Sequence, residues 1–584
     1  MFPKTLLPLV PYLKKYRSGY AWGAICVLIM NGTWALIPPV IGRAIDDMGK
    51  AGVSLHKIGS LALLLLLISG VKAIFQFLIR WIVIGVSREI EFDLRNDLFL
   101  HLETLSHRFY QRTRTGDIMA RATNDLNAVR MLLGPGFMYT ANTVVFTAFA
   151  LVFMLHISSR LTFYAFLPLP IVSIVIQYFG RRIHERFERI QAMFSEISAR
   201  AQENFSGVRI IRAYVQEEAE IAGFEVANRE YIKRSLTLVR LMGMLWPTLE
   251  TMLTLAIVLV LWLGGREVLH GHITVGAFTA FNTFMAQLTW PIIALGWVIN
   301  IFQRGTASLR RIEQLMQEKP EIADASDVVP ELLDQELQGD IEIRNLNFSY
   351  NGTPVLHDIN LDIPAGTSLA IVGPTGSGKT TLVSLIPRIY DADPGSVLID
   401  GRSVREYPLA MLRRNIGFVP QETFLFSETI RENIAFGVQN ARDTDVAWAA
   451  EAANIAAEIE GFPEQYKTMV GERGITLSGG QKQRTAIARA LIRNPRILVL
   501  DDALSSVDTQ TEDKILNHLR DVMRGRTTIF ISHRVSTVRN ADRIAVLHGG
   551  RIVELGTHEE LLNRNGYYSD LYNKQLLEEE LAEV

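Results

Sequence analysis

The chain has 584 residues, of which 48% are hydrophobic and 21% are charged. This length exceeds what one hydrophobic core usually organises, so two or more domains are expected. The 59 basic and 61 acidic side chains give a net charge of −2, which gives no reason to expect nucleic acid as a partner, and the single cysteine, Cys26, excludes a disulfide framework or a thiolate metal site within one chain.

Six long apolar segments precede residue 305. A bilayer core of about 30 Å is crossed by about 20 mostly apolar helical residues, and helices in soluble cores seldom stay uncharged for so long. The sequence therefore predicts an all-α transmembrane domain at residues 1–305, with spans near 20–41, 58–86, 137–156, 161–179, 244–264 and 275–301.

The distribution of basic residues predicts the orientation of these spans. Lys14, Lys15 and Arg17 precede the first span, and arginines are frequent in the connections 87–136 and 180–243. Because basic residues stay on the cytoplasmic side, the N-terminus and both long connections are expected there.

Both long connections have helical character. They contain almost no proline and carry apolar residues at helical spacing, such as Ile90, Leu94 and Leu98. A helix of about 50 residues reaches about 75 Å, so the spans are expected to continue far into the cytoplasm. Chain reversals are expected near residues 114–117 and 213–216, where the tips could contact a cytoplasmic domain.

Several polar side chains lie within the predicted spans. Charged groups in lipid are costly and tend to face a cavity or a partner helix. Lys72, Asn282 and Gln287 are the candidates for a substrate cavity. Arg80 and Glu250 lie nearer the cytoplasmic end of their spans, where their side chains could instead reach the interface.

The sequence changes character after the last span. An acidic stretch predicts a linker at residues 306–340, and strands alternating with helical patterns predict an α/β domain at 341–565, followed by an acidic C-terminal helix or tail at 566–584. The strand candidates are 341–348, 368–372, 416–419, 497–500 and 528–531.

A phosphate-binding loop lies between one of these strands and a helical segment. The pattern G-x-x-x-x-G-K-[ST] is matched at every fixed position, in a context where backbone N–H groups can surround phosphate oxygens. Lys379 is expected to contact the β- and γ-phosphates, and the Thr380 hydroxyl to bind Mg²⁺. The ATP-binding residues predicted here are Gly373, Pro374, Thr375, Gly376, Ser377, Gly378, Lys379, Thr380 and Thr381.

Two further segments support nucleotide chemistry. An apolar strand ends at Asp501, which is a suitable position for a second Mg²⁺ ligand. The segment Leu477, Ser478, Gly479, Gly480 and Gln481 precedes a helix and forms a glycine turn rich in N–H donors. With these motifs, the sequence resembles a half-transporter of the ATP-binding cassette (ABC) exporter family over essentially its whole length, with a type IV-like fold.

The resemblance implies further roles. Tyr350 resembles the aromatic residue that stacks on adenine, Gln421 a residue that touches Mg²⁺ and the attacking water, and His533 a histidine that contacts the γ-phosphate. Residues 477–481 resemble the signature segment that binds the ATP of a partner subunit, Asp508 resembles a residue of the loop that communicates across the dimer, and 471–474 resembles a segment that contacts the helical tips.

One residue departs from the family pattern. The family usually has Glu after the Mg²⁺-binding Asp, whereas this chain has Asp502. Losing one methylene withdraws the carboxylate by about 1–1.5 Å, and misplacements of this order can cost about 10²-fold in rate. The resemblance therefore implies a slow ATP site, as in the impaired site of heterodimeric exporters, although a homodimer with two slow sites stays open.

The resemblance implies a multi-pass protein of the bacterial inner (plasma) membrane, with ATP and Mg²⁺ as cofactors and a second half-transporter as partner. The expected function is ATP-driven export of an amphipathic or apolar compound, such as a drug, a lipid or a peptide. Two alternatives remain: a regulatory subunit that mainly binds ATP in a heterodimer, and a nucleotide-gated channel or receptor.

Overall fold

The computed structural model describes residues 4–50, 54–324, 336–471, 474, 476–504, 515, 519, 522–532 and 534–582. The chain divides into two compact units. Unit 1 comprises Met1–Phe99 and Gly116–Gln317, and unit 2 comprises Leu100–Thr115 and Glu318–Val584.

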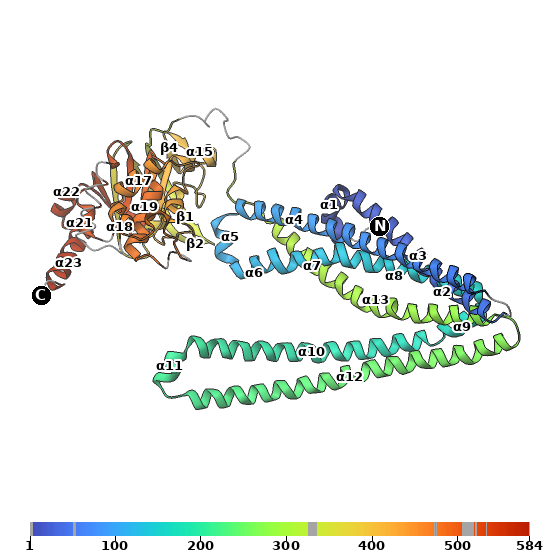
Figure 1. Cartoon of the computed structure of the whole chain (residues 1–584). Coiled ribbons are helices and arrows are strands. Elements are labelled where there is room, and N and C mark those ends of the chain that lie inside the picture. Colours follow the sequence, from blue (N-terminus) through green and yellow to red (C-terminus); the bar gives the residue numbers. More distant parts are fainter. Residues whose placement is uncertain are drawn as a thin grey trace. The chain divides into compact units, whose positions relative to one another are not determined.

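Unit 1 is helical, and Figure 1 shows its long helices in blue to green. It begins with η1 (Lys4–Leu9) and α1 (Val10–Lys15). Within the described residues, six helical runs are long and apolar enough to cross a membrane. They are α2 (Arg17–Met48); α3 (Leu55–Ile79), η2 (Arg80–Ile84) and α4 (Gly85–Thr104); α6 (Thr115–Ala120), η3 (Arg121–Asp125), α7 (Leu126–Met131), η4 (Leu132–Gly136) and α8 (Phe137–Ile157); α9 (Ser159–Phe166) with α10 (Leu169–Ser206); α12 (Glu217–Leu269); and α13 (Val275–Met316).

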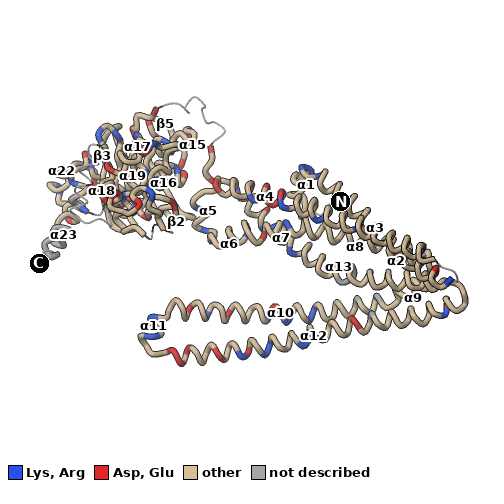
Figure 2. The backbone as a smooth tube through the Cα atoms, in the orientation of Figure 1, with Lys and Arg blue, Asp and Glu red and all other residues tan. Residues whose placement is uncertain are grey.

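Several runs are much longer than a bilayer requires. The run Leu55–Thr104 has 50 residues and α12 has 53, so each reaches about 75–80 Å at 1.5 Å per residue. The chain reverses between α4 and α6 through α5 (His107–Arg112), and between α10 and α12 through α11 (Val208–Ala213), close to the two predicted positions. Figure 2 shows that the charged residues of α10 and α12 gather toward the α11 end.

The helices of unit 1 pack through aromatic and small apolar side chains. Trp34 of α2 stacks on Phe146 of α8 with ring centroids 3.9 Å apart, and both belong to a cluster that includes Phe281 and Phe284 of α13. By contrast, α3 exposes large apolar side chains such as Leu66 and Phe77, as expected of a lipid-facing surface.

A buried ion pair joins η3 to α13. Asp125 is 6% exposed, and it accepts hydrogen bonds from Ser308 Oγ at 2.8 Å and from both the Nε (2.8 Å) and Nη2 atoms of Arg311. Burial alone raises the pKa of Asp125, but the hydrogen bonds from Arg311 and Ser308 outweigh it and hold this pKa below its usual value. The pair therefore fixes the helical run that leads into α8 against the C-terminal part of α13.

Unit 2 contains two sheets. The four-stranded sheet has the order β2-β1-β4-β5, and the six-stranded sheet has the order β10-β9-β3-β8-β7-β6, in which all neighbours are parallel except β10. The strands are β1 (Ile341–Tyr350), β2 (Thr353–Ile363), β3 (Ser368–Val372), β4 (Val397–Ile399), β5 (Arg402–Ser403), β6 (Ile416–Val419), β7 (Ile497–Asp501), β8 (Thr527–Ile531), β9 (Arg543–His548) and β10 (Arg551–Gly556).

Helices flank these strands. They are α14 (Lys379–Leu385), α15 (Leu409–Arg414), α16 (Ile430–Ala435), α17 (Asp443–Ala452), α18 (Ala456–Glu460), η6 (Gln465–Lys467), α19 (Gly479–Leu491), α21 (Val535–Val538), α22 (His558–Asn563) and α23 (Tyr567–Ala582). The predicted fold class, a helical membrane domain with six apolar spans joined to an α/β domain, is confirmed.

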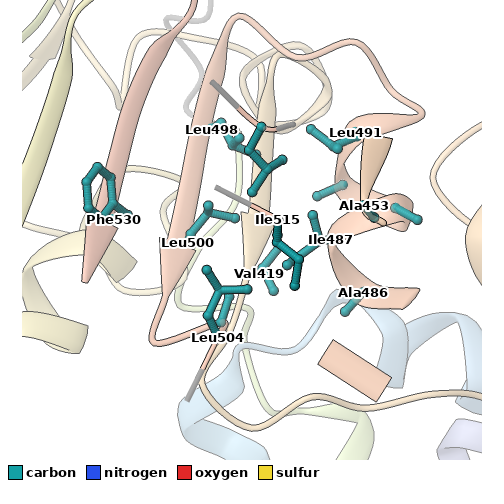
Figure 3. Packing of buried hydrophobic residues seen from close by; sticks show 14 of the residues in the cluster. Val419, Ala453, Ala486, Ile487, Leu491, Leu498, Leu500, Leu504, Ile515 and Phe530 are labelled. Atoms are coloured by element: carbon teal, nitrogen blue, oxygen red, sulfur yellow. The ribbon is translucent and has the colours of Figure 1, made fainter. Parts of the chain in front are cut away.

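The six-stranded sheet separates α14 from α19. On one face, Leu498 and Leu500 of β7 pack in a cluster with Ile487 and Leu491 of α19, which Figure 3 shows from close by. On the other face, the alternate residues of β7 pack in a cluster with Leu382 and its neighbours on α14. Because side chains alternate along a strand, the two helices lie on opposite faces of one sheet.

The segment Leu100–Thr115, which lies between the second and third spans, packs in unit 2. Arg112 Nη2 lies 2.7 Å from Glu318 Oε2, and Ser106 Oγ donates to Glu321 Oε2 at 3.1 Å. The ring of His107 meets that of Tyr390 edge-on, with centroids 5.9 Å apart. These contacts hold α5 against the α/β domain.

Candidate nucleotide site

The phosphate loop joins β3 to α14. Three of its residues have left-handed φ angles: Gly373 (151°), Gly376 (82°) and Gly378 (101°). A Cβ on Gly373 would collide with the carbonyl oxygen of Leu547, and one on Gly378 would lie 2.7 Å from Leu356 Cδ2. Glycine is therefore required for the path of the loop and for its close packing on neighbouring strands.

Lys379 is the first residue of α14 and its side chain folds across the loop. Its Nζ donates to the carbonyl oxygens of Gly373 at 2.8 Å and Pro374 at 2.9 Å. The residue is 7% exposed. Burial lowers the pKa of this ammonium, while the neighbouring carboxylates of Asp502 and Asp501 raise it. The geometry holds a cation inside the loop, where it suits the negative charge of phosphates.

Thr380 and Asp501 meet at the carboxyl end of the parallel strands. Thr380 Oγ1 donates to Asp501 Oδ1 at 3.1 Å. Asp501 is 1% exposed, and its Oδ2 is buried without a hydrogen-bond partner among the described residues. Burial raises the pKa of Asp501 to about 6, and the nearby charge of Asp502 adds to this. A buried carboxylate oxygen without a partner, beside a threonine hydroxyl, fits a hard cation such as Mg²⁺.

Asp502 and Gln421 lie beside this pair. Gln421, in the loop after β6, donates from Nε2 to Asp502 Oδ2 at 3.4 Å. Asp502 has φ +50°, and its backbone N–H donates to the carbonyl of Ile531 at 3.1 Å. Asp and Asn adopt the left-handed region more readily than longer side chains. The structure thus brings Asp502 and Gln421 together next to the Thr380–Asp501 pair.

Tyr350 ends β1 and belongs to an aromatic group. Its hydroxyl donates to Thr381 Oγ1 at 3.3 Å, and its ring meets Phe348 and Tyr390 edge-on with centroids 5.0 and 5.2 Å away. The remaining loop residues include Ser377, whose Oγ is buried without a partner among the described residues, and the exposed Pro374 and Thr375. A hydroxyl in this position could donate to a phosphate oxygen.

The glycine turn forms the start of α19. Ser478 caps this helix: its Oγ accepts from Gln481 N at 3.2 Å, and the Gln481 side chain accepts from Ser478 N at 2.9 Å. Leu477 is buried, whereas Gly479 is exposed and Gly480 is partly exposed. The turn thus presents N–H groups on the face of the sheet opposite to α14.

Some predicted residues lie outside the part of the chain that the structure describes. They are His533, Asp508 with residues 505–507, and positions 472 and 473 of the predicted tip-contact segment. Their neighbours Ser532 and Leu504 are described.

The three candidates for a substrate cavity do not come together. Lys72 lines a cavity between helices of unit 1. Asn282 instead donates to the carbonyl of Phe278 on its own helix at 3.3 Å, and Gln287 Oε1 is buried without a partner among the described residues. Neither residue lines the cavity that holds Lys72.

Sequence reasoning did not identify Tyr390 or Glu318. Tyr390 joins Tyr350 to His107 of α5, and Glu318 pairs with Arg112. The pair of Glu318 with Arg112 joins positions 206 residues apart in the sequence. The contacts of Tyr390 are aromatic packing that has no local sequence signature. The only sequence signal was the prediction that a helical tip contacts the cytoplasmic domain.

Comparisons with known proteins agree with this geometry. Residues 21–292 match the family model "ABC transporter transmembrane region", and residues 356–505 match the family model "ABC transporter". The chain is 37% identical over 572 residues to the "Probable multidrug resistance ABC transporter ATP-binding/permease protein YheI" of Bacillus subtilis, covering 97% of both chains. It is also 37% identical over 589 residues to an "ATP-dependent lipid A-core flippase" of Syntrophus aciditrophicus, covering 99% of this chain and 95% of the relative.

A solved structure is similar over nearly the whole length. A bacterial Atm1-family ABC exporter with ATP bound superposes with a TM-score of 0.79 at 30% sequence identity, covering 96% of this chain and 99% of the other. Both the membrane helices and the α/β domain therefore have counterparts in one known polypeptide.

Proposed function

The chain belongs to the ABC transporter family, with the transmembrane region and the ATP-binding domain in one polypeptide, and we propose that it is one half of a dimeric exporter that hydrolyses ATP to move an amphipathic or apolar compound out of the cell. The observation that carries this proposal is the group formed by the phosphate loop, Thr380 and Asp501 in a chain that also has six apolar spans. The names of two relatives refer to multidrug resistance and to a lipid A-core flippase, and such compounds partition into membranes.

Each predicted residue of the ATP site has a specific role in this proposal. Tyr350 stacks on adenine, residues 373–381 surround the phosphates, and Lys379 contributes the positive charge at the β- and γ-phosphates. Thr380, Asp501 and Gln421 would hold Mg²⁺, which would supply positive charge that offsets the negative charge of the phosphates. His533 contacts the γ-phosphate, and Asp502 with Gln421 orients the attacking water.

The signature turn completes the ATP site of a second copy or a related subunit. Within one chain, α14 and α19 lie on opposite faces of the six-stranded sheet, so the phosphate loop and the turn at residues 477–481 begin helices on different sides of the sheet. Two cassettes arranged head-to-tail would place each loop opposite the partner's turn, with Asp508 near the contact between them. ATP is thereby bound between two subunits, and its binding draws them together.

The membrane placement follows the distribution of charge. Lys14, Lys15 and Arg17 lie before the first span, and the long helical extensions carry many arginines, so we place the N-terminus and the ATPase domain in the cytoplasm. Closure of the cassettes would act on α5, which already contacts Glu318 and Tyr390 of the α/β domain. The proposed membrane is the bacterial inner membrane.

Asp502 favours a second candidate function. Its carboxylate is one methylene shorter than the family's usual Glu, and its contact with Gln421 is long at 3.4 Å. A subunit with such a site can bind ATP and stabilise the dimer while a partner subunit hydrolyses. This regulatory role predicts that the chain is inactive as an ATPase when it is alone.

The test uses purified full-length chain in nanodiscs that hold one copy or two copies. An exporter active as a homodimer hydrolyses ATP at least tenfold faster per chain in two-copy discs, and Lys379→Ala abolishes this activity. The matched control is Lys574→Ala, an exposed lysine of α23. Equal and negligible rates in both discs, with Mg·ATP binding intact, would support the regulatory role instead.

Vesicle uptake then separates a pump from a channel. Only a pump accumulates a fluorescent amphipathic substrate against its gradient, and Lys379→Ala is expected to stop this accumulation. Failure of the wild-type chain to bind Mg·ATP in either disc would refute both functions.

A further inference from the structure

A cavity of about 270 Å³ lies among the membrane helices of unit 1. Four helical runs contribute to it: α2, α3 with η2, α8 and α13. Its polar lining consists of Lys72, Gln76 and Arg80 from the second run and Tyr139 and Asn142 from α8, and its aromatic lining includes Trp34 and Trp290. The cavity therefore has a cationic stripe on one helix and an aromatic wall on the others.

Within the part of the chain that the structure describes, the two cations lack a counter-charge. None of the described residues that line the cavity is Asp or Glu. Among the described residues neither Lys72 nor Arg80 forms an ion pair, and the Lys72 ammonium lies over the ring of Trp34, 4.6 Å from its centroid. A cation at membrane depth is costly unless it faces a cavity or a partner. A cation–π contact with Trp34 offsets only part of that cost.

The spacing of the polar side chains places them on one line. Lys72, Gln76 and Arg80 follow each other at intervals of four residues, so they share one face of the helix over about 12 Å. The helix changes to π-helical geometry at Arg80–Ile84, which is a feature frequent at functional sites. The sequence had suggested that Arg80 could reach the interface, and in the structure this residue lines the cavity.

The rest of the lining suits an amphipathic molecule. Asn142 Oδ1 is buried without a hydrogen-bond partner among the described residues, so it can accept from a hydroxyl or amide group of a ligand. Met30, Ile79 and Met138 add apolar surface, and Trp34 and Trp290 add aromatic surface. A ligand with an acidic head and an apolar body would satisfy both sides of the cavity.

We propose that this cavity makes the transporter selective for amphipathic anions, whose carboxylate or phosphate is bound by Lys72 and Arg80 while the apolar body lies against Trp34 and Trp290. The inference rests on the proposed export function and narrows its substrate class. The anion could be a free amphiphile or the headgroup of a membrane phospholipid, since both present the same chemistry to the two cations.

Binding of 11-(dansylamino)undecanoic acid to full-length protein in phosphatidylcholine nanodiscs tests the proposal, with the primary amide of the same molecule as the neutral probe. Energy transfer from tryptophan to the dansyl group reports binding, since Trp34 and Trp290 line the cavity. The acid is expected to bind at least tenfold more tightly than the amide, because charge-assisted hydrogen bonds distinguish them.

Lys72→Gln and Arg80→Gln are each expected to weaken binding of the acid about tenfold and to leave binding of the amide unchanged, whereas Lys72→Arg retains the preference. The control is Lys57→Gln on the same helix, where Asp47 keeps its contact with Lys50. Equal affinities for acid and amide in the wild type, or unchanged acid binding in both glutamine variants, would overturn the inference.

Two added measurements complete the design. In the first, phosphatidylglycerol replaces a fraction of the phosphatidylcholine. Displacement of the acid would show that the anionic headgroup of a membrane lipid binds in the cavity, and retention of the acid would show that the cavity takes free amphiphiles. Either result supports an anion site and identifies the source of the anion. Mg·ATP binding is measured in every variant. If it is intact while the acid preference is absent, this inference fails alone, and if the wild type does not bind Mg·ATP, the proposed function fails.

Discussion

The most informative perturbation is Asp502→Glu. Asp502 lies beside Gln421, with 3.4 Å between Gln421 Nε2 and Asp502 Oδ2, and next to the Thr380–Asp501 pair. One added methylene extends the carboxylate by about 1–1.5 Å, and restoring geometry by this amount can be worth about 10²-fold in rate, or about 2.7 kcal/mol of activation free energy. We therefore expect kcat for ATP hydrolysis to rise between tenfold and a hundredfold.

The backbone sets an opposing cost. Asp502 has φ +50°, where Asp is tolerated better than Glu, so the substitution costs about 1 kcal/mol of folding stability and lowers the melting temperature by a few degrees. Because this strain is present in both the ground state and the transition state, it does not cancel the gain in rate. The assay is phosphate release at saturating Mg·ATP in two-copy nanodiscs, with Asp502→Asn as the inactive control. If Asp502→Glu and Asp502→Asn both matched the wild type, the carboxylate would have no part in turnover and the reasoning would be wrong.

Three further outcomes are expected. Burial raises the pKa of Asp501 to about 6, so the folded state binds this proton more tightly than the unfolded state does. Without nucleotide, the folding stability should therefore increase as pH falls through 6, while the affinity for Mg·ATP should decrease over the same range. Asp501→Asn should remove both effects, the first measured in thermal melts and the second in nucleotide titrations. Asp125→Ala should lower the unfolding free energy by about 1–3 kcal/mol in a denaturation series, because it leaves the half-exposed Arg311 without its buried partner, and an equal effect from Arg229→Ala would contradict this. Arg112→Ala should change stability by less than about 1 kcal/mol, since its pair with Glu318 is exposed, yet reduce substrate-stimulated ATPase several-fold; unchanged stimulation would show that α5 does not transmit through this pair.

The sequence predicts best what depends on short segments. The phosphate loop needs only glycines at fixed spacing after an apolar strand, and the structure has β3 at the predicted residues 368–372 with left-handed glycines after it. The central strands β7 and β8 were predicted because strands covered on both faces are continuously apolar. The six apolar spans follow from hydropathy and length alone.

The sequence could not predict contacts that need two distant elements. The cavity around Lys72 is formed by four helical runs. The rotation of each helix about its own axis determines that Arg80 lines the cavity and that Asn282 does not. The aromatic series from His107 through Tyr390 to Tyr350 joins segments more than 200 residues apart. Hydropathy identifies a span but does not indicate which neighbouring helix contacts each face of that span. The candidate cavity residues were chosen by polarity alone, and they therefore lie at separate places in the structure.

One helix relates the cavity to the nucleotide site. The run Leu55–Thr104 is continuous over 50 residues; it carries Lys72 and Arg80, and it leads into the segment Leu100–Thr115, which packs in the α/β unit. Arg80 and Thr104 are 24 residues apart, or about 36 Å along a helix. The ring of Tyr350, on which adenine would stack, contacts the ring of Tyr390. The ring of Tyr390 in turn contacts His107 of α5. Coupling requires an element that both sites bias. A continuous helix that carries the two cations in its N-terminal half and the middle, with α5 beyond its C-terminal end, connects the two regions covalently. The π-helical segment at Arg80–Ile84 lies directly at the cavity, where a change of helical register would move Arg80 relative to Lys72 and so alter the affinity for an anion.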